Sequence, residues 1–216
     1  FAAPIAEREV QVRSTIWYTE LPISPRLLGG ADRLGITPSP GGRHPGRGTR
    51  NYLLSLGSGA YLEIVGPDPE QHDPSGPRWF GVDELQGPRL VGWAVKAPDI
   101  ERRVADARFA GYDPGPIQPM VRTQPDGTVL HWRLTTGGGR AVPDLVPFLI
   151  DWGDTPHPSV TSSQGASLLK VWAESPQPES VEAKLRALGV ALDVRPGERT
   201  LLIARLAGPG GELTLS

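Results

Sequence analysis

A threefold recurrence is the feature that most constrains how this chain of 216 residues can fold. Three times, a short apolar segment is followed by proline and then by a stretch with helical spacing that ends at a glycine. The ending glycines are Gly35, Gly111 and Gly189, spaced by 76 and 78 residues. A glycine directly after an apolar stripe is typical of a helix C-terminus. A period this long predicts a repeated supersecondary unit and not a solenoid of short repeats.

The residues around each stripe predict the same order of elements, β-α-β-β-β. Helical spacing predicts helices over 99–110 and 178–188, and a poorer one before Gly35, which Gly29 and Gly30 interrupt. Tight turns are predicted at 57–59 and 125–127, whereas 39–50 and the Pro/Gly stretch after Gly111 read as loops. The strongest strand patterns lie at 15–20, 51–56, 60–65, 89–99, 128–135, 147–152, 168–175, 200–207 and 212–216. We therefore expect units at 14–87 and 88–158, forming a region 1–158, a linker at about 159–166, and a third, partial unit within 159–216.

Composition excludes several classes of protein. The chain has no cysteine, so disulfides, thiolate nucleophiles and thiolate metal ligands are excluded. The net charge is −2 and no basic patch stands out, which argues against a nucleic-acid partner. No apolar run reaches the length of a transmembrane helix. We expect a cytoplasmic protein with no membrane or nucleic-acid partner.

Tandem β-α-β-β-β units resemble the vicinal oxygen chelate superfamily, which includes glyoxalases, extradiol dioxygenases and bleomycin-resistance proteins. The segments RHPGRGTRNYLLSLGSGAYLEIVGPDP (43–69) and VPFLIDWGDTPHP (146–158) resemble its glyoxalase-like domain branch. The resemblance implies an α+β fold of repeated βαβββ modules. Two of these modules would pair around a cavity, and the third would be a related module.

The resemblance also implies a divalent metal, held by residues of the first and last strands of each paired unit. Glu63 and Asp151 lie on the last strands, and a carboxylate pair facing one cavity suits an ion such as Mn, Fe, Ni or Zn. The first-strand positions are Thr15 and Gly92, and neither residue is a good ligand. His131 would supply the missing imidazole if it faces inward. In the third unit, Lys170 and Glu212 fall at ligand-like positions.

A polar segment and an aromatic pair are the remaining candidates. In the family-like segment, His44 would act as an acid, base or ligand at the cavity mouth, beside Glu63 as the second catalytic candidate. Arg47, Arg50 and Asn51 precede a strand and either clamp a substrate anion or form a solvated loop. Trp79 and Phe80 form either a lid over the cavity or an anchor for a long loop.

Two functions stay open at this point. One is a metal-dependent lyase, isomerase or dioxygenase acting on an oxygen-chelating substrate, which the carboxylate pair favours. The other is a metal-free protein that binds or sequesters a small aromatic or anionic compound, which Thr15 and Gly92 favour. In both cases the partner is a small molecule, and we expect a homodimer, with the third unit serving packing or dimerisation.

Overall fold

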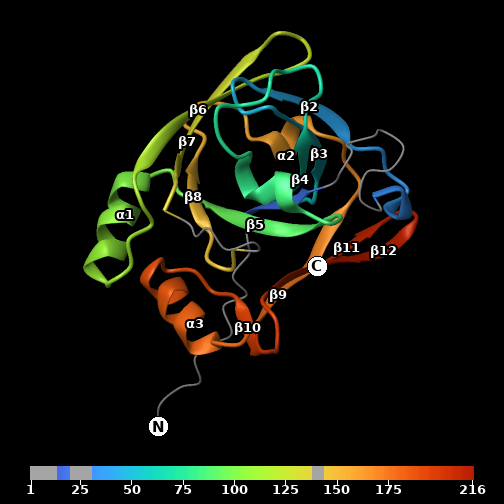
Figure 1. The fold of residues 1–216 in the computed structure, drawn as a ribbon. Helices are drawn as coiled ribbons and strands as arrows, with labels where there is room; N and C mark the ends of the chain where they lie inside the picture. Colours follow the sequence, from blue (N-terminus) through green and yellow to red (C-terminus); the bar gives the residue numbers. More distant parts are fainter. Residues whose placement is uncertain (1–13, 20–30, 138–143) are drawn as a thin grey trace.

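The strands of the protein form two separate sheets. The structure is a computed structural model that describes residues 14–19, 31–137 and 144–216. One sheet is a closed barrel of eight strands and the other has four strands (Figure 1). The barrel strands are β1 (Ser14–Thr19), β2 (Ser39–His44), β3 (Thr49–Ser55), β4 (Tyr61–Pro67), β5 (Arg89–Lys96), β6 (Ile117–Thr123), β7 (Val129–Thr135) and β8 (Phe148–Asp151). The second sheet holds β9 (Ser167–Ser175), β10 (Asp193–Pro196), β11 (Leu201–Gly208) and β12 (Gly211–Leu215).

The barrel consists of two halves with the same strand order. The first half runs β1-β4-β3-β2 and the second runs β5-β8-β7-β6. In each half the first and last strands are parallel neighbours, and the halves meet where β1 pairs with β5 and β2 with β6, both antiparallel. Closing the sheet removes its open edges and leaves the inward-facing side chains around one interior. The predicted α+β class is confirmed, and the strand order of the two halves is consistent with βαβββ modules.

The third unit repeats the order of elements but not the pairing of strands. Its elements follow the order β9, α3 (Pro178–Ala187), β10, β11, β12, yet its sheet runs β10-β9-β11-β12. The first strand therefore lies between β10 and β11 and does not pair with the last strand. Because β12 pairs only with β11 in the described residues, this unit encloses no cavity of the barrel type.

The glycine-terminated helices are confirmed where the structure describes them. The helix α1 (Ile100–Phe109) ends before Gly111, and α3 ends before Gly189. Gly35, Gly111 and Gly189 all have positive φ, the conformation that favours glycine after a helix. In the first unit the described part of the stripe is a 3-10 turn, η1 (Ala31–Leu34), and the remainder of that stripe lies outside the described residues.

The segments ahead of β3 and β7, which read as turn-rich loops, contain the short second strand of each half. Residues 39–44 form β2 and residues 117–123 form β6. The pairing of β2 with β3 shifts between Pro40 and Gly42, and such an irregularity lets proline and glycine occupy a strand. His44 therefore ends a strand in a fixed position and does not lie in a loop.

The four-stranded sheet packs against the outside of the barrel. One apolar cluster contains Leu54, Leu62 and Trp93 of the barrel together with Leu202 and Leu206 of β11. The segment predicted as a linker is also packed, because it contains the short helix α2 (Pro158–Thr161) and Ser163, whose carbonyl accepts a hydrogen bond from the Ser55 N–H. These contacts attach the third unit to the barrel wall and leave the barrel interior to the two paired units.

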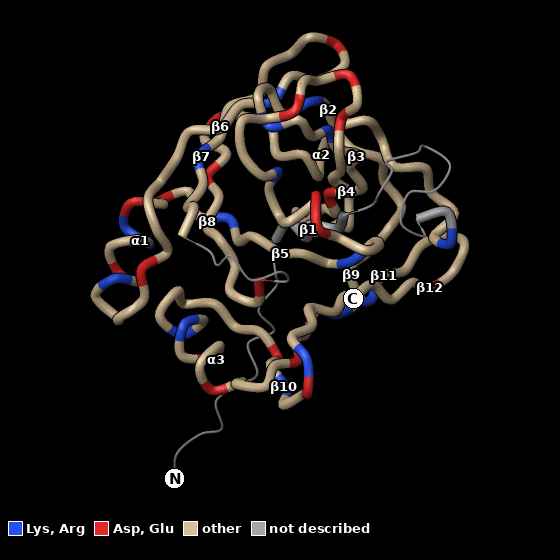
Figure 2. The backbone as a smooth tube through the Cα atoms, in the orientation of Figure 1, with Lys and Arg blue, Asp and Glu red and all other residues tan. Residues whose placement is uncertain are grey.

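Charged residues of both signs are scattered over the barrel and the second sheet (Figure 2). No helix within the described ranges is long and apolar enough to cross a membrane.

Candidate functional site in the barrel interior

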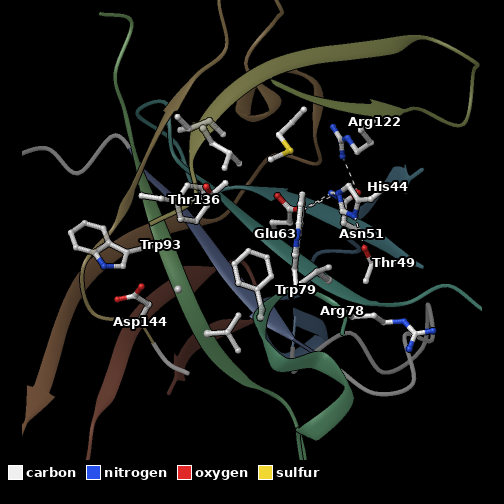
Figure 3. A pocket seen from close by; sticks show the side chains of 18 of the residues that line it. His44, Thr49, Asn51, Glu63, Arg78, Trp79, Trp93, Arg122, Thr136 and Asp144 are labelled. Carbon is white, nitrogen blue, oxygen red and sulfur yellow. Dashed lines mark hydrogen bonds and ion pairs between the residues drawn. The ribbon is translucent and has the colours of Figure 1, made fainter. Parts of the chain in front are cut away.

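The barrel encloses a cavity of about 600 Å³. Most of its wall is aromatic or aliphatic, and several of its polar side chains lie together on one side (Figure 3). The apolar lining includes Tyr61, Val65, Trp79, Phe80, Val91, Trp93, Met120, Trp132, Leu134, Phe148, Ile150 and Trp152. The shape and lining are those of a small-molecule site, which is usually concave and apolar with few polar groups.

Strand alternation decides which residues reach the cavity. On β4 the lining residues are Tyr61, Glu63 and Val65, and at the end of the second half they are Phe148, Ile150 and Trp152. Successive side chains of a strand point to opposite faces, so Glu63 and Ile150 occupy the central inward positions of the two last strands. The predicted carboxylate pair across one cavity is therefore wrong, because Ile150 stands where Asp151 was expected.

A buried polar cluster lies at one end of the cavity (Figure 3). The amide nitrogen of Asn51, on β3, donates a hydrogen bond of 2.7 Å to Oε1 of Glu63 and lies 3.4 Å from Nε2 of His44. Nε2 of His44 is 3.6 Å from Oε1 of Glu63, and its Nδ1 is 2.9 Å from Oγ1 of Thr49. The Asn51 amide nitrogen donates to Nε2 of His44 in the tautomer whose proton is on Nδ1, whereas in the other tautomer the Nε2–H faces the Glu63 carboxylate.

Arg122 completes this polar cluster, and reasoning from the sequence missed it. It lies on β6 and is only 2% exposed, and its Nη1 donates a hydrogen bond of 2.9 Å to Oδ1 of Asn51. Its Nε has no hydrogen-bond partner within the part of the chain that the structure describes. A signal was available only after β6 was recognised as a strand, because Met120 and Arg122 then share the inward face.

Glycine at position 41 makes room for the link between Asn51 and Arg122. A Cβ atom on Gly41 would collide with Oδ1 of Asn51 and with Nη1 of Arg122. Protein interiors are close-packed, so the polar pair occupies the space that a side chain of residue 41 would need. The segment 39–44 (SPGGRH), which reads as a loop in the sequence, therefore packs directly against the polar cluster.

Burial and two arginines keep His44 neutral. Desolvation lowers its pKa to about 3, and the positive charges of Arg122 and Arg47 add to this effect, whereas Asp68 opposes it. At neutral pH the imidazole is an uncharged donor and acceptor of hydrogen bonds. His44 is therefore not an imidazolium at neutral pH in the free protein. Its unprotonated ring nitrogen can still accept a proton from a ligand during a reaction.

An aromatic pair borders the cavity. Trp79 and Phe80 both line it, from the 3-10 segment η2 (Trp79–Glu84). Phe80 adopts the left-handed conformation at φ 59°, which is uncommon for a bulky residue, and its ring stacks on Phe148 at 6.5 Å. The guanidinium of Arg47 lies 4.2 Å from the centre of the Trp79 ring. These contacts seat Trp79 and Phe80 on the cavity wall and place the exposed Arg47 beside them.

Four of the residues proposed from the sequence do not line the cavity, namely Arg47, Arg50, His131 and Asp151. Asp151 is buried on the outer side of β8, where it pairs with Arg133 at 2.6 Å and accepts a hydrogen bond from the Gly153 N–H. His131 is exposed on β7, next to Trp132, which lines the cavity. Arg50 pairs with Asp68 at 3.3 Å and Glu70 at 2.9 Å. Strand parity explains Asp151 and His131, since a shift of one residue moves a side chain to the other face.

The donor set does not fit the divalent metal that the resemblance implies. Glu63 and His44 are neighbours, but the facing wall offers Ile150, and Gly92 lines the cavity without a side chain. Thr15 lies on β1 in register with Tyr61, and its side chain is outside the described part. Lys170 and Glu212 lie on the four-stranded sheet, Lys170 pairing with Asp193. Among the described residues no group of three His, Cys, Asp or Glu side chains is close enough to hold an ion.

One solved structure shares this fold, and a family model matches most of the chain. No curated protein matches the chain. Among solved structures, a hypothetical protein from Staphylococcus aureus has a TM-score of 0.56 at 13% identity, over 93% of this chain and 83% of that one. A mutant of 4-hydroxymandelate synthase from Streptomyces coelicolor reaches 0.48 at 20% identity, over 93% and 61%. Methylmalonyl-CoA epimerase from Mycobacterium tuberculosis reaches 0.39 at 15% identity, over 63% and 85%. The glyoxalase-like domain model matches residues 30–189, and the chain therefore belongs to the glyoxalase-like domain family.

Proposed function

We propose that this protein binds a small organic molecule in the barrel cavity through its own side chains, without a metal held by the barrel walls. The observation that carries the proposal is the cavity itself, a largely apolar space of about 600 Å³ with one buried polar cluster. Pockets of this size and lining enclose most of a small ligand's surface, and the few polar groups set its orientation.

The aromatic walls favour a ligand with a flat body. Trp132 and Trp152 lie 5.0 Å apart between ring centres, and both line the cavity. The buried Nε1 of Trp152 lacks a hydrogen-bond partner within the described residues. Flat rings gain from offset or edge contacts with such indoles, and an acceptor atom on the ligand would satisfy the indole N–H.

The metal-dependent lyase, isomerase or dioxygenase that the resemblance implies has less support. Its chemistry would need ligands on both halves of the barrel, and the second half offers Ile150 and Gly92. Replacing ligand positions by apolar residues removes a metal site but leaves a binding cavity intact. We therefore derive no reaction step through a metal.

A second candidate function is metal-free proton transfer on the bound molecule. It is favoured by the neutral imidazole of His44 and the carboxylate of Glu63, 3.6 Å apart at the cavity wall. A carboxylate held by Asn51 could take a proton from a ligand carbon, because catalytic bases need hydrogen-bond reach to the proton they remove. The test is hydrogen–deuterium exchange at the methylene carbon of 2-naphthylacetate in heavy water. An exchange rate that the protein raises and that Glu63→Gln returns to the rate without protein would support this function. The same exchange rate with and without the protein would contradict it.

The test of binding uses 2-naphthamide, a flat, neutral probe, and isothermal titration calorimetry. We expect one site per chain and a shift of the Trp152 indole N–H signal in the NMR spectrum. Trp132→Ala should weaken binding about tenfold, because it removes part of the aromatic wall. Trp172→Ala is the matched control, since Trp172 lies on β9, outside the cavity. Absence of binding by both 2-naphthamide and 2-naphthoate would overturn the proposal.

The homodimer and the cytoplasmic location stay predictions. Sedimentation velocity over a range of protein concentrations tests the dimer, and cell fractionation tests the location.

A further inference from the structure

We infer that the molecule bound in the cavity is an organic anion whose charged group contacts the guanidinium of Arg122. This inference rests on the proposed function, because it names the class of ligand for the same cavity. It is not carried by the aromatic wall, which would accept neutral molecules equally well.

The first argument is the burial of an arginine without a counter-ion. Arg122 lines the cavity and is 2% exposed, yet it forms no salt bridge with any residue that the structure describes. Buried charges are normally paired, because a charge transferred from water to a protein interior loses its hydration. Nη1 of Arg122 donates a hydrogen bond to Oδ1 of Asn51, whereas its Nε has no acceptor in the described chain. A ligand anion would supply the missing acceptors.

The second argument is that Asn51 separates Arg122 from Glu63. The Asn51 amide accepts a hydrogen bond from Arg122 through Oδ1 and donates one to Glu63 through Nδ2. Gly41 leaves the space in which this arrangement packs. The amide thus links the cation and the carboxylate as a spacer. Arg122 remains available to an external anion, and Asn51 and Gly41 act as positioning residues for it.

The third argument is the electrostatic asymmetry of the cavity. Arg47 lies over the Trp79 ring, and together with Arg122 it lowers the pKa of His44. Both arginines make the potential at His44 more positive, whereas the carboxylates of Asp68 and Glu63 make it more negative. Asp144 lines the cavity on the opposite side of the view from Arg122 (Figure 3). A ligand with one anionic end is therefore expected to bind with that end toward Arg122 and its apolar body along the aromatic wall.

The test compares three probes with the same ring system, 2-naphthoate, 2-naphthyl phosphate and neutral 2-naphthamide, by calorimetry at pH 7.5. We expect at least one anion to bind about tenfold or more tightly than the amide, since hydrogen bonds to charged groups contribute about 1.5–3 kcal/mol. The tighter of the two anions identifies carboxylate or phosphate as the preferred group. Arg122→Gln should abolish the preference, because it weakens the binding of both anions much more than that of the neutral 2-naphthamide.

Arg133→Gln is the matched control, because Arg133 lies on the neighbouring strand and pairs with Asp151 outside the cavity. Its preference for anions should equal that of the wild type. If the amide binds the wild type as tightly as both anions do, the anion inference is overturned while cavity binding stands. If no probe binds, the proposed function itself fails. Should Arg122→Gln not fold, the comparison of probes on the wild type still decides, and Gly41→Ala provides a second variant that is expected to reduce the preference.

Discussion

Asn51 and Arg122 are joined by a hydrogen bond of 2.9 Å that links β3 in the first half of the barrel to β6 in the second. The two residues are 71 positions apart in the chain. The same Asn51 side chain holds Glu63, so one amide connects two charged groups in the barrel interior. This amide determines the geometry of the polar cluster.

Replacing Asn51 by leucine should lower the free energy of unfolding by about 3 kcal/mol. The substitution leaves Arg122 and Glu63 buried without the partner that each now has, and breaking such buried bonds costs about 1–3 kcal/mol per group. Urea denaturation measures the effect. Gln118→Ala, at an exposed position on β6, is the control and should change stability by less than about 0.5 kcal/mol. An Asn51→Leu protein as stable as the wild type would show that the amide link is not structural.

Gly41→Ala should destabilise the protein by about 1–3 kcal/mol, the usual cost of overpacking a close-packed interior. The new methyl group would displace Asn51 or Arg122, since both atoms of their hydrogen bond stand in its place. Gly87→Ala is the matched control, because a Cβ there meets no atom within 4 Å. Thermal denaturation of both variants checks this, and equal melting temperatures would contradict the expected collision.

Protein stability should fall on acidification because of His44. Its folded pKa of about 3 lies below the unfolded value of 6.5, so the unfolded chain binds the proton first. Stability is therefore full above about pH 6.5 and is lost progressively toward pH 3. Between pH 7 and 5 the loss from this group is about 2 kcal/mol.

Unfolding experiments on the wild type and His44→Gln at pH 5, 6 and 7 measure this dependence. His157, whose pKa burial lowers to about 4, contributes in the same direction to both proteins. The variant should accordingly show a shallower slope and not a flat line. Equal slopes, or an NMR titration of the His44 ring near pH 6.5, would contradict the burial of a neutral imidazole.

Asp151→Asn should leave the binding of 2-naphthoate unchanged while reducing stability. Its carboxylate pairs with Arg133 on the outer side of the barrel, so the cost of about 1–3 kcal/mol falls on folding and not on the cavity. Calorimetry and urea denaturation of the same preparation separate the two effects. A weakened affinity at unchanged stability would indicate that Asp151 acts on the ligand after all.

Protein purified without chelators should carry Mn, Fe, Ni or Zn below one equivalent in elemental analysis. Two neighbouring donors, His44 and Glu63, are fewer than the three that protein metal sites commonly provide. Glu63→Ala should carry the same amount as the wild type. Stoichiometric metal that disappears in the variant would restore the metal-dependent alternative.

Part of the fold is local and follows from short segments. The helix ends at Gly111 and Gly189 need positive φ, and the turn at 57–59 places Gly57, Ser58 and Gly59 at positive φ. Glycine tolerates this conformation at no steric cost, which is why these boundaries could be predicted. The turn at 125–127 is likewise local, with the Gly127 N–H bonded to the carbonyl of Gln124.

The inward face of the last strand in the second half follows from aligning the two halves on their glycines. Glu63 precedes Gly66 by three residues, and Ile150 precedes Gly153 by three, so alignment on the glycines pairs Glu63 with Ile150. Alignment of the two carboxylates, Glu63 with Asp151, instead puts the second strand one residue out of register. A register shift of one residue moves every side chain of a strand to the other face of the sheet. Interactions within the strand itself do not distinguish the two registers.

The sequence by itself determined the order of elements, their glycine boundaries and the family, because these depend on residues close together in the chain. Only the tertiary structure decided the site. Strand pairing brought Arg122 to Asn51, barrel closure buried His44 and lowered its pKa, and the sheet order β10-β9-β11-β12 set the third unit apart from the two that enclose the cavity. Contacts between residues far apart in sequence depend on the whole packed arrangement of the chain, and no short segment encodes them.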